Sequence, residues 1–505
     1  MEPLPFPRAE APLVRCDTGG AHPVGGVRVR LPSFRSPAWV LAETATMSVF
    51  SLLSMLAIGR VIGPEAAGTG MIAIAAFALL DILGATLFTD ALVQRPGLTR
   101  RHVESALTVA ALAGLGMAVV LALGAPWLAA ASGVPQVETL CLALAPLLPL
   151  SAFAGSGSGP VLRESRFALL AARVLIGQPL ALAVGLWMAA TGWGAWAMIG
   201  NQAVATLVAF LMLLAFGRLL RRPRIERAAL ADLWPVAAPQ VTALVIMMGR
   251  YRLFLLALGI SANEAVLAVS HFAFRMLESV VLVVAQTTGR IGMPRLCALH
   301  ADREAQAETF GDLAQLQALL GLPAAAGIAL IAPDLVALLL GPAWAGAGEA
   351  ARIVGFAALL GFVHGEPFSL FVARGRARWN VWINLVALII PLVALLLLRP
   401  TTPQAAALAW ASQSLILPPL LTFLVLRELR RSLAWLLLRI APAIAGTVAM
   451  TLAVLAVQRG LDLGPGGDLA AAVLVGGAAY LAVALTLLRG RVPRALRRQT
   501  AHAAA

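Results

Sequence analysis

Charged side chains interrupt several long apolar stretches of this chain, and arginines are prominent among them. Arg250 and Arg252 lie two residues apart in one stretch, and Arg275 lies in the next. A guanidinium group stays charged at low dielectric and donates paired hydrogen bonds to phosphate oxygens. These arginines therefore predict a site for an anionic group such as a diphosphate.

Acidic and histidine side chains accompany the arginines. His271, Arg275 and Glu278 follow the spacing i, i+4, i+7 and share one helix face. That face either lines an internal cleft or holds an ion pair between Arg275 and Glu278, and the two are compatible. Because an ionisable residue inside a membrane span costs several kcal/mol unless it faces a partner or a cavity, each is a candidate site residue. The remaining candidates are Arg60, Asp81, Asp90, His364 and Glu366.

For candidates near the ends of a stretch, snorkelling to the membrane interface is the alternative interpretation. His271, Glu278, Asp81, Asp90, His364 and Glu366 are the candidates for coupling or cavity-lining polar groups.

The composition shows where such charges must lie. Hydrophobic residues make up 60% of the 505 residues and charged residues 12%, which is typical of an integral membrane protein. About 20 residues of helix cross a bilayer core, and about fourteen apolar stretches reach that length. The ten-residue alternation of an outer-membrane barrel is missing. We therefore expect an all-α polytopic protein. The stretches are centred near residues 50, 79, 117, 147, 180, 205, 246, 276, 322, 361, 388, 414, 446 and 479.

Arginine clusters occupy alternate gaps between the stretches. The clusters begin at Arg95, Arg163, Arg218, Arg290, Arg374 and Arg427, and the intervening gaps are nearly bare. Since arginine-rich short loops stay in the cytoplasm, we expect both termini there and an even number of spans. Residues 1–36 lack an apolar run and predict a disordered cytoplasmic extension. Residues 491–505 predict a basic cytoplasmic tail.

A weak internal repeat at a spacing of about 205 residues organises the chain. The sequence APWL at 125–128 corresponds to APDL at 332–335, and the arginine cluster at Arg163 to the one at Arg374. We expect a lobe of six helices at 37–230, a second at 231–431, and two extra helices at 432–490. Two parallel lobes related by an axis along the membrane normal would leave a cleft that serves as a transport path.

Several kinds of chemistry have no support in the sequence. The chain lacks lysine, which excludes a Walker phosphate loop and Schiff-base catalysis. The glycine-rich run at 155–160 predicts a flexible turn between helices. No zinc motif occurs and the three cysteines lie far apart, so we expect no metal, cofactor or disulfide. The net charge of +14 is spread over many loops, which argues against nucleic-acid binding. Short external loops favour a protein without catalytic residues, that is, not an enzyme.

Five short segments carry a family resemblance that extends from about residue 42 to 426. They are AIGRVIGPEAAG at 57–68, FTDALVQR at 88–95, LRESRF at 162–167, GWGAWA at 192–197 and LGPAW at 340–344. With these segments the chain resembles the lipid-linked oligosaccharide flippases of the polysaccharide biosynthesis family, within the superfamily that includes the multidrug and toxic-compound extruders.

The resemblance implies a bacterial inner-membrane flippase for undecaprenyl-diphosphate-linked oligosaccharide repeats, used in lipopolysaccharide O-antigen, capsule or exopolysaccharide synthesis. By the same resemblance, Arg60, Arg250, Arg252 and Arg275 are expected to bind the headgroup. Membrane lipids, a polysaccharide polymerase and glycosyltransferases are the expected partners. The alternatives are a multidrug extruder, whose cavity would be acidic, and a lipid-linked-sugar polymerase or ligase. The sugar repeat, the coupling ion and the oligomeric state have no signature in the sequence.

Overall fold

The computed structural model describes residues 38–217, 219, 223–299, 301–460 and 462–488. The predicted N-terminal extension and the predicted C-terminal tail lie outside the described residues. The described part is helical, and its elements are α1 Ala38–Ala85, α2 Thr89–Gln94, α3 Arg100–Ser132, α4 Gln136–Leu144, α5 Leu147–Arg163, α6 Phe167–Ala190, α7 Trp196–Phe216, α8 Arg227–Ser261, α9 Glu264–Ala298, α10 Arg303–Leu340, η1 Pro342–Trp344, α11 Ala345–Leu359, η2 Leu360–Phe362, α12 Pro367–Ala373, α13 Arg378–Leu398, α14 Pro403–Leu429, α15 Leu433–Gly460 and α16 Pro465–Leu488.

Within the described ranges, eleven helical segments are long and apolar enough to cross a membrane. Helix α8 is bent by 49° between its two halves, Arg227–Thr242 and Met247–Ser261. If these halves are counted together as one span, the described ranges contain twelve candidate spans. The segment Ala42–Gln94 has 53 residues, or about 80 Å of helix, which is enough for two crossings. The all-α, multi-pass architecture is confirmed. The count of fourteen stays a prediction, consistent with these helices if α9 also crosses.

The first two predicted spans are joined within α1. Gly63 has φ 78° and ψ 170°, which no helix accommodates, and Pro64 follows it. Because proline lacks the N–H and restricts the residue before it, the helix is interrupted there. The interruption thus falls between the first two predicted apolar stretches, which are centred near residues 50 and 79.

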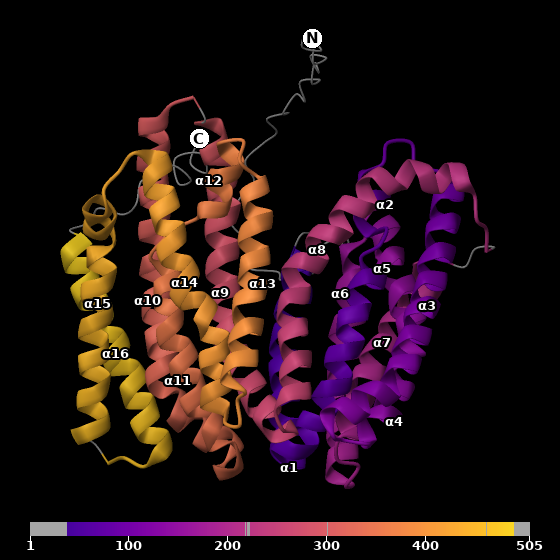
Figure 1. Cartoon of the computed structure of the whole chain (residues 1–505), viewed down its shortest axis with the longest axis horizontal. Coiled ribbons are helices and arrows are strands. Elements are labelled where there is room, and N and C mark those ends of the chain that lie inside the picture. Colours follow the sequence, from indigo (N-terminus) through magenta and orange to yellow (C-terminus); the bar gives the residue numbers. More distant parts are fainter. Residues whose placement is uncertain (1–37, 218, 220–222, 300, 461, 489–505) are drawn as a thin grey trace, which may run out of the picture.

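Two helical bundles lie side by side (Figure 1). Helices α1 to α7 form one lobe and α9 to α14 the other, while α15 and α16 pack against each other and against α10 on the outer flank. Helix α8 packs on α1, α2 and α3 as well as on α13, so it contacts both lobes. Two six-helix lobes with two added helices were the predicted architecture.

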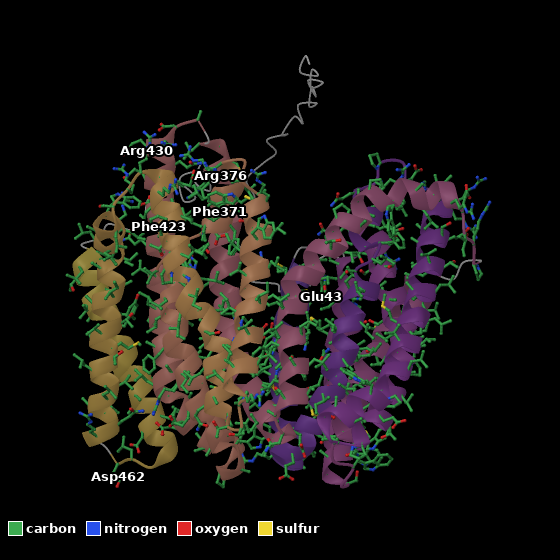
Figure 2. All side chains as sticks on the ribbon, viewed as in Figure 1. Glu43, Phe371, Arg376, Phe423, Arg430 and Asp462 are labelled. Atoms are coloured by element: carbon green, nitrogen blue, oxygen red, sulfur yellow. The ribbon has the colours of Figure 1, made fainter. Side chains whose placement is uncertain are left out.

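The two ends of the bundles differ in charge. Arg376 and Arg430 lie at one end and Asp462 at the opposite end (Figure 2). Exposed tryptophans, which favour membrane interfaces, accompany both ends. Trp127 and Trp187 stand in the arginine-poor halves of α3 and α6, whereas Trp382 stands near the arginine-rich start of α13. The helices thus present an apolar belt between two interfacial zones.

The glycine-rich run at 155–160 is not a turn, so that prediction was wrong. It lies inside α5. A Cβ on Gly155 would lie 2.0 Å from the carbonyl oxygen of Ala85, at the end of α1. Thr89 Oγ1 donates to the Gly155 carbonyl at 3.0 Å. The glycines allow α5 to approach the turn between α1 and α2, a packing role that small residues serve in membrane helices.

Candidate functional site

A cluster of charged side chains lies where α8, α9 and α1 meet. Arg275 of α9 forms an ion pair with Glu278 one turn later, with Nη1 and Oε2 separated by 2.9 Å. Its Nη2 donates to Ser51 Oγ of α1 at 3.2 Å. The predicted intrahelical pair is therefore present, and it reaches across the boundary between the lobes.

Arg250 of α8 belongs to the same cluster. It interacts electrostatically with Glu278, so one carboxylate serves two arginines. Its Nε is buried and has no hydrogen-bond partner among the described residues. A buried guanidinium N–H without a partner carries a large desolvation penalty, which a bound anion would relieve.

Arg252 lies on another side of α8, as expected for residues i and i+2. It interacts electrostatically with Asp81 of α1 and with His271 of α9. Asp81 also lies beside Ser151 of α5, and its Oδ1 has no hydrogen-bond partner in the described part of the chain. Both arginines of α8 thus join the cluster, each next to a different carboxylate.

His271 is engaged by a tyrosine. Tyr251 Oη and His271 Nδ1 are 2.9 Å apart, and the two rings are stacked with centroids 5.8 Å apart. Trp410 of α14 packs edge-on against Tyr251, with centroids 5.3 Å apart. Tyr251 was missed by sequence reasoning, although its position between Arg250 and Arg252 was a signal. It orients the imidazole beside Arg252.

Two further candidates lie apart from the cluster. Arg60, three residues before the kink in α1, donates to the carbonyl oxygen of Leu339 near the end of α10 at 2.7 Å. Asp90 lies in the short helix α2. No polar contact within the described ranges joins either residue to Arg250, Arg252 or Arg275. The headgroup role expected for Arg60 therefore stays a prediction without a supporting contact.

His364 and Glu366 occupy a break in the helical path between η2 and α12. His364 Nδ1 donates to the carbonyl oxygen of Gly365 at 3.0 Å, which fixes its tautomer. Glu366 accepts hydrogen bonds from Thr288 Oγ1 of α9 at 3.3 Å and from Ser369 Oγ at 3.4 Å. Both candidates thus lie in one helix break of the second lobe, each with its own hydrogen-bond partners.

An ion pair that the sequence did not predict joins α1 to α6. Arg173 Nη2 lies 3.2 Å from Glu43 Oε1, and both side chains are about one fifth exposed. Glu43 lies on the side of its bundle that faces the other lobe (Figure 2). Arg173 lies inside α6, although it follows closely on the arginine cluster that begins at Arg163 and that was predicted to lie in a loop.

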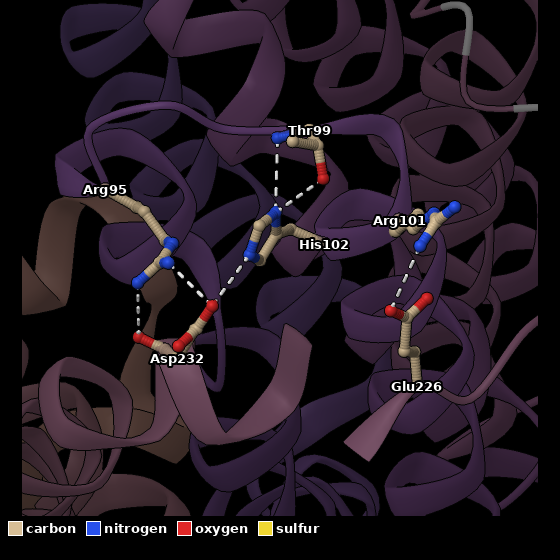
Figure 3. A network of polar contacts seen from close by, with 6 residues as sticks. All are labelled: Arg95, Thr99, Arg101, His102, Glu226 and Asp232. Carbon is tan, nitrogen blue, oxygen red and sulfur yellow. Dashed lines mark hydrogen bonds and ion pairs between the residues drawn. The ribbon is translucent and has the colours of Figure 1, made fainter. Parts of the chain in front are cut away.

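A polar network connects the first lobe to the first half of α8 (Figure 3). Asp232 Oδ2 accepts from Arg95 Nη2 at 2.6 Å and lies 3.4 Å from His102 Nε2. The backbone N–H and the hydroxyl of Thr99 both contact His102 Nδ1, at 3.2 and 2.7 Å. Because that N–H is a donor, Nδ1 accepts and Nε2 carries the proton toward Asp232.

An apolar groove of about 260 Å³ lies between α15 and the helices α10 and α11 of the second lobe. Leu322 and Ala326 of α10 form one wall, and Ile444 and Val448 of α15 form the other. A second apolar hollow, which shares Ile444, continues along α15 to Ala434. The described residues contain no cluster of three or more metal-ligating side chains.

Two solved structures share this fold. The lipid II flippase MurJ, in an inward closed conformation, gives a TM-score of 0.71 at 11% identity, covering 90% of this chain and 100% of that one. An inward-facing multidrug resistance transporter of the MATE family in the MOP superfamily gives 0.60 at 15% identity, covering 81% and 99%. At these identities the likeness concerns the fold alone.

Sequence comparison, unlike the comparison of folds, identifies the family of this chain. The succinoglycan biosynthesis transport protein ExoT of Rhizobium meliloti (strain 1021) is 24% identical over 330 residues, which cover 62% of this chain and 63% of that protein. The chain thus spans less than two thirds of that relative. The family model described as polysaccharide biosynthesis protein matches residues 57–349, more than half of the 505 residues. The chain belongs to the polysaccharide biosynthesis protein family.

Proposed function

We propose that this protein is a flippase that moves a lipid-linked oligosaccharide across the bacterial inner membrane, with both termini in the cytoplasm. The observation that carries the proposal is the arginine cluster at the lobe boundary. Arg250, Arg252 and Arg275 face two carboxylates, Asp81 and Glu278, which leaves a net charge of +1 (three minus two). Such a surplus suits the diphosphate of an undecaprenyl-linked repeat.

The unpartnered Nε of Arg250 supports the same proposal. A diphosphate could not cross hydrocarbon alone, because an unpaired charge in a low dielectric costs many kcal/mol. Arginines sheltered between two lobes would compensate that charge while the lobes alternate their access. The lipid tail would stay in the bilayer, and the apolar groove between α10 and α15 offers it a surface.

This mechanism is transport and needs no covalent step, so we propose that the protein is not an enzyme. ExoT, a relative in sequence, is a succinoglycan biosynthesis transport protein, which supports a role in polysaccharide synthesis. The partners that we propose are a polymerase and glycosyltransferases of the same pathway. A multidrug extruder of the same fold is the alternative. A cationic drug would need carboxylates free of arginine, whereas Asp81 and Glu278 both lie beside arginines.

The test is quantification of surface polysaccharide in a strain that depends on this protein. We expect Arg250→Ala and Arg275→Ala each to lower export by about tenfold or more, since losing a charge-assisted hydrogen bond costs about 1.5–3 kcal/mol. Arg275→Lys should keep part of the activity, because it retains the charge.

Arg352→Ala is the matched control. Arg352 forms an i, i+3 ion pair with Glu349 at 3.3 Å, as Arg275 does with Glu278, but it lies on α11 outside the cluster. Its loss should leave export unchanged. Normal export in the Arg250→Ala Arg275→Ala double variant would exclude the charged-cluster mechanism.

A further inference from the structure

The helical path from α11 to α12 is broken inside an apolar segment. Pro342–Ala373 is long and apolar enough to span the membrane, yet residues 363–366 between η2 and α12 are not helical. Gly365 has φ +73°, and a Cβ there would lie 2.8 Å from Phe310 of α10. The glycine is therefore needed both for the backbone conformation and for the close approach to α10.

Glu366 lies in this break and faces two other elements. Its carboxylate oxygens accept hydrogen bonds from Thr288 of α9 and from Ser369 of α12, at 3.3 and 3.4 Å. A Cβ on Gly292 of α9 would lie 3.5 Å from Glu366 Cγ, so a glycine face of α9 makes room for the side chain. These hydrogen bonds are long, which leaves the carboxylate loosely held.

The partners of Glu366 differ from those of three other carboxylates in the apolar helices, Glu43, Glu278 and Asp81. Glu43 pairs with Arg173, Glu278 pairs with Arg275, and Asp81 interacts with Arg252. An arginine partner keeps a carboxylate ionised. For Glu366, no ion pair occurs within the described part of the chain.

The groups that face Glu366 among the described residues are neutral. They are the hydroxyls of Thr288 and Ser369, the glycines of α9, and the adjacent Gly365, whose carbonyl already accepts from His364. A hydroxyl donates to an ionised carboxylate and accepts from a protonated one, and its oxygen also ligates a cation. Glu366 is thus surrounded by groups that suit a charged, a protonated and a cation-bound carboxyl.

We propose that Glu366, Thr288 and Ser369 form a site for a monovalent cation, a proton or a sodium ion, separate from the arginine cluster. A carboxylate at membrane depth without a basic partner is costly to keep ionised, and a bound cation removes that cost. Breaks in membrane helices are where transporters hold coupling ions. Cation binding draws Thr288 of α9 and Ser369 of α12 onto one carboxyl group.

The site is connected to the proposed headgroup cluster through one helix. Thr288 lies on α9, which also carries His271, Arg275 and Glu278. A cation that tightens the contact between α9 and α12 would change the position of these side chains relative to Ser51 of α1. The role of the site in driving transport rests on the function proposed above, whereas the binding of the cation does not.

The experiment measures the thermal unfolding of the purified full-length protein in detergent. One arm titrates sodium chloride against choline chloride at constant ionic strength and pH. The other arm varies the pH in choline chloride alone. A ligand that binds only the folded state raises the unfolding temperature with its concentration. A sodium response identifies sodium as the cation, and a response to protons alone identifies the proton.

Glu366→Gln should remove the response, because an amide neither ionises nor releases a proton. Glu349→Gln is the matched control, since Glu349 pairs with Arg352 on α11 and its variant should keep the wild-type response. A wild-type response that persists in Glu366→Gln, or a wild-type protein that responds to neither cation, would overturn the site.

Two milder variants keep the proposal testable if Glu366→Gln folds poorly. Thr288→Val and Ser369→Ala each remove one hydroxyl and keep the carboxyl group. Each should raise the half-saturating sodium concentration by about tenfold, or shift the midpoint of the pH response by about one unit, and unchanged values in both would contradict the site.

The Arg250→Ala Arg275→Ala double variant separates the two proposals. It should lose export but keep the cation response. Normal export in that variant would reject the headgroup proposal alone, and a lost response in Glu366→Gln would still establish the cation site.

Discussion

Arg95 and Asp232 form an ion pair of 2.6 Å between the loop after α2 and the first half of α8. Asp232 also lies 3.4 Å from His102 of α3. The residues of α8 beyond the 49° bend carry Arg250 and Arg252. The contacts of Asp232 therefore hold the beginning of this helix on the first lobe, while its end supplies the arginine cluster.

We expect Asp232→Ala to loosen Arg227–Thr242 without unfolding the rest of the protein. Arg95 is 30% exposed and Asp232 is 47% exposed, so the pair is worth at most about 1 kcal/mol. Amide hydrogen exchange in this segment should accelerate by about fivefold, measured by mass spectrometry. Arg101→Ala is the control, because Arg101 is 62% exposed and lies 3.5 Å from Glu226. Equal acceleration throughout the chain would indicate global destabilisation instead.

Gly68 allows α1 and α9 to touch just after the kink in α1. A Cβ on Gly68 would lie 1.8 Å from the backbone oxygen of Glu264. Gly68→Ala should therefore force the two lobes apart there and cost about 1–3 kcal/mol in the free energy of unfolding, as other overpacked sites do. A lowered unfolding temperature in detergent is the readout.

Gly124→Ala is the control for Gly68. It lies inside α3 with no atom within 4 Å of the added Cβ. Alanine there should be neutral or stabilising by up to about 1 kcal/mol. Equal unfolding temperatures for Gly68→Ala and Gly124→Ala would show that α1 and α9 accommodate the added Cβ without a loss of stability.

Gly365→Ala tests the helix break. The φ of +73° costs an L-residue about 1–2 kcal/mol, and the added Cβ would also meet Phe310 at 2.8 Å. The unfolding temperature should fall. Gly361→Ala, four residues earlier, adds a Cβ to open space at an ordinary φ and should have little effect. If the two variants behave alike, the backbone conformation at residue 365 is not required.

Arg439 of α15 forms ion pairs with carboxylates of α10. Its guanidinium pairs with Glu308 and Asp312 and lies 4.8 Å from the ring centroid of Trp435. Arg439→Ala leaves two carboxylates without this partner, so exchange should accelerate at the start of α15 by about tenfold, for a loss of roughly 1–3 kcal/mol. Arg459→Ala, at the exposed end of the same helix, is the control. Unchanged exchange in Arg439→Ala would mean that apolar packing alone holds α15.

Local features of the sequence were sufficient for the fold class. The length and hydrophobicity of each stretch determine that it forms a membrane helix, because an apolar backbone segment in lipid must satisfy its own hydrogen bonds. The kink at Gly63 has a local cause as well, because Pro64 follows it, but it was not predicted. The i, i+3 pair of Arg275 and Glu278 was predictable, since helical spacing alone brings these side chains together.

Only the tertiary structure decided which distant charges meet. The contacts of Glu43 with Arg173, of Arg275 with Ser51 and of Glu366 with Thr288 join different helices. The glycine run at 155–160 was misinterpreted because it is needed for contact with the end of α1, which its own composition does not reveal. Contacts between helices depend on how each helix is rotated and tilted in the bundle. Those angles are set by the packing of all the side chains together, and no single stretch of sequence contains them.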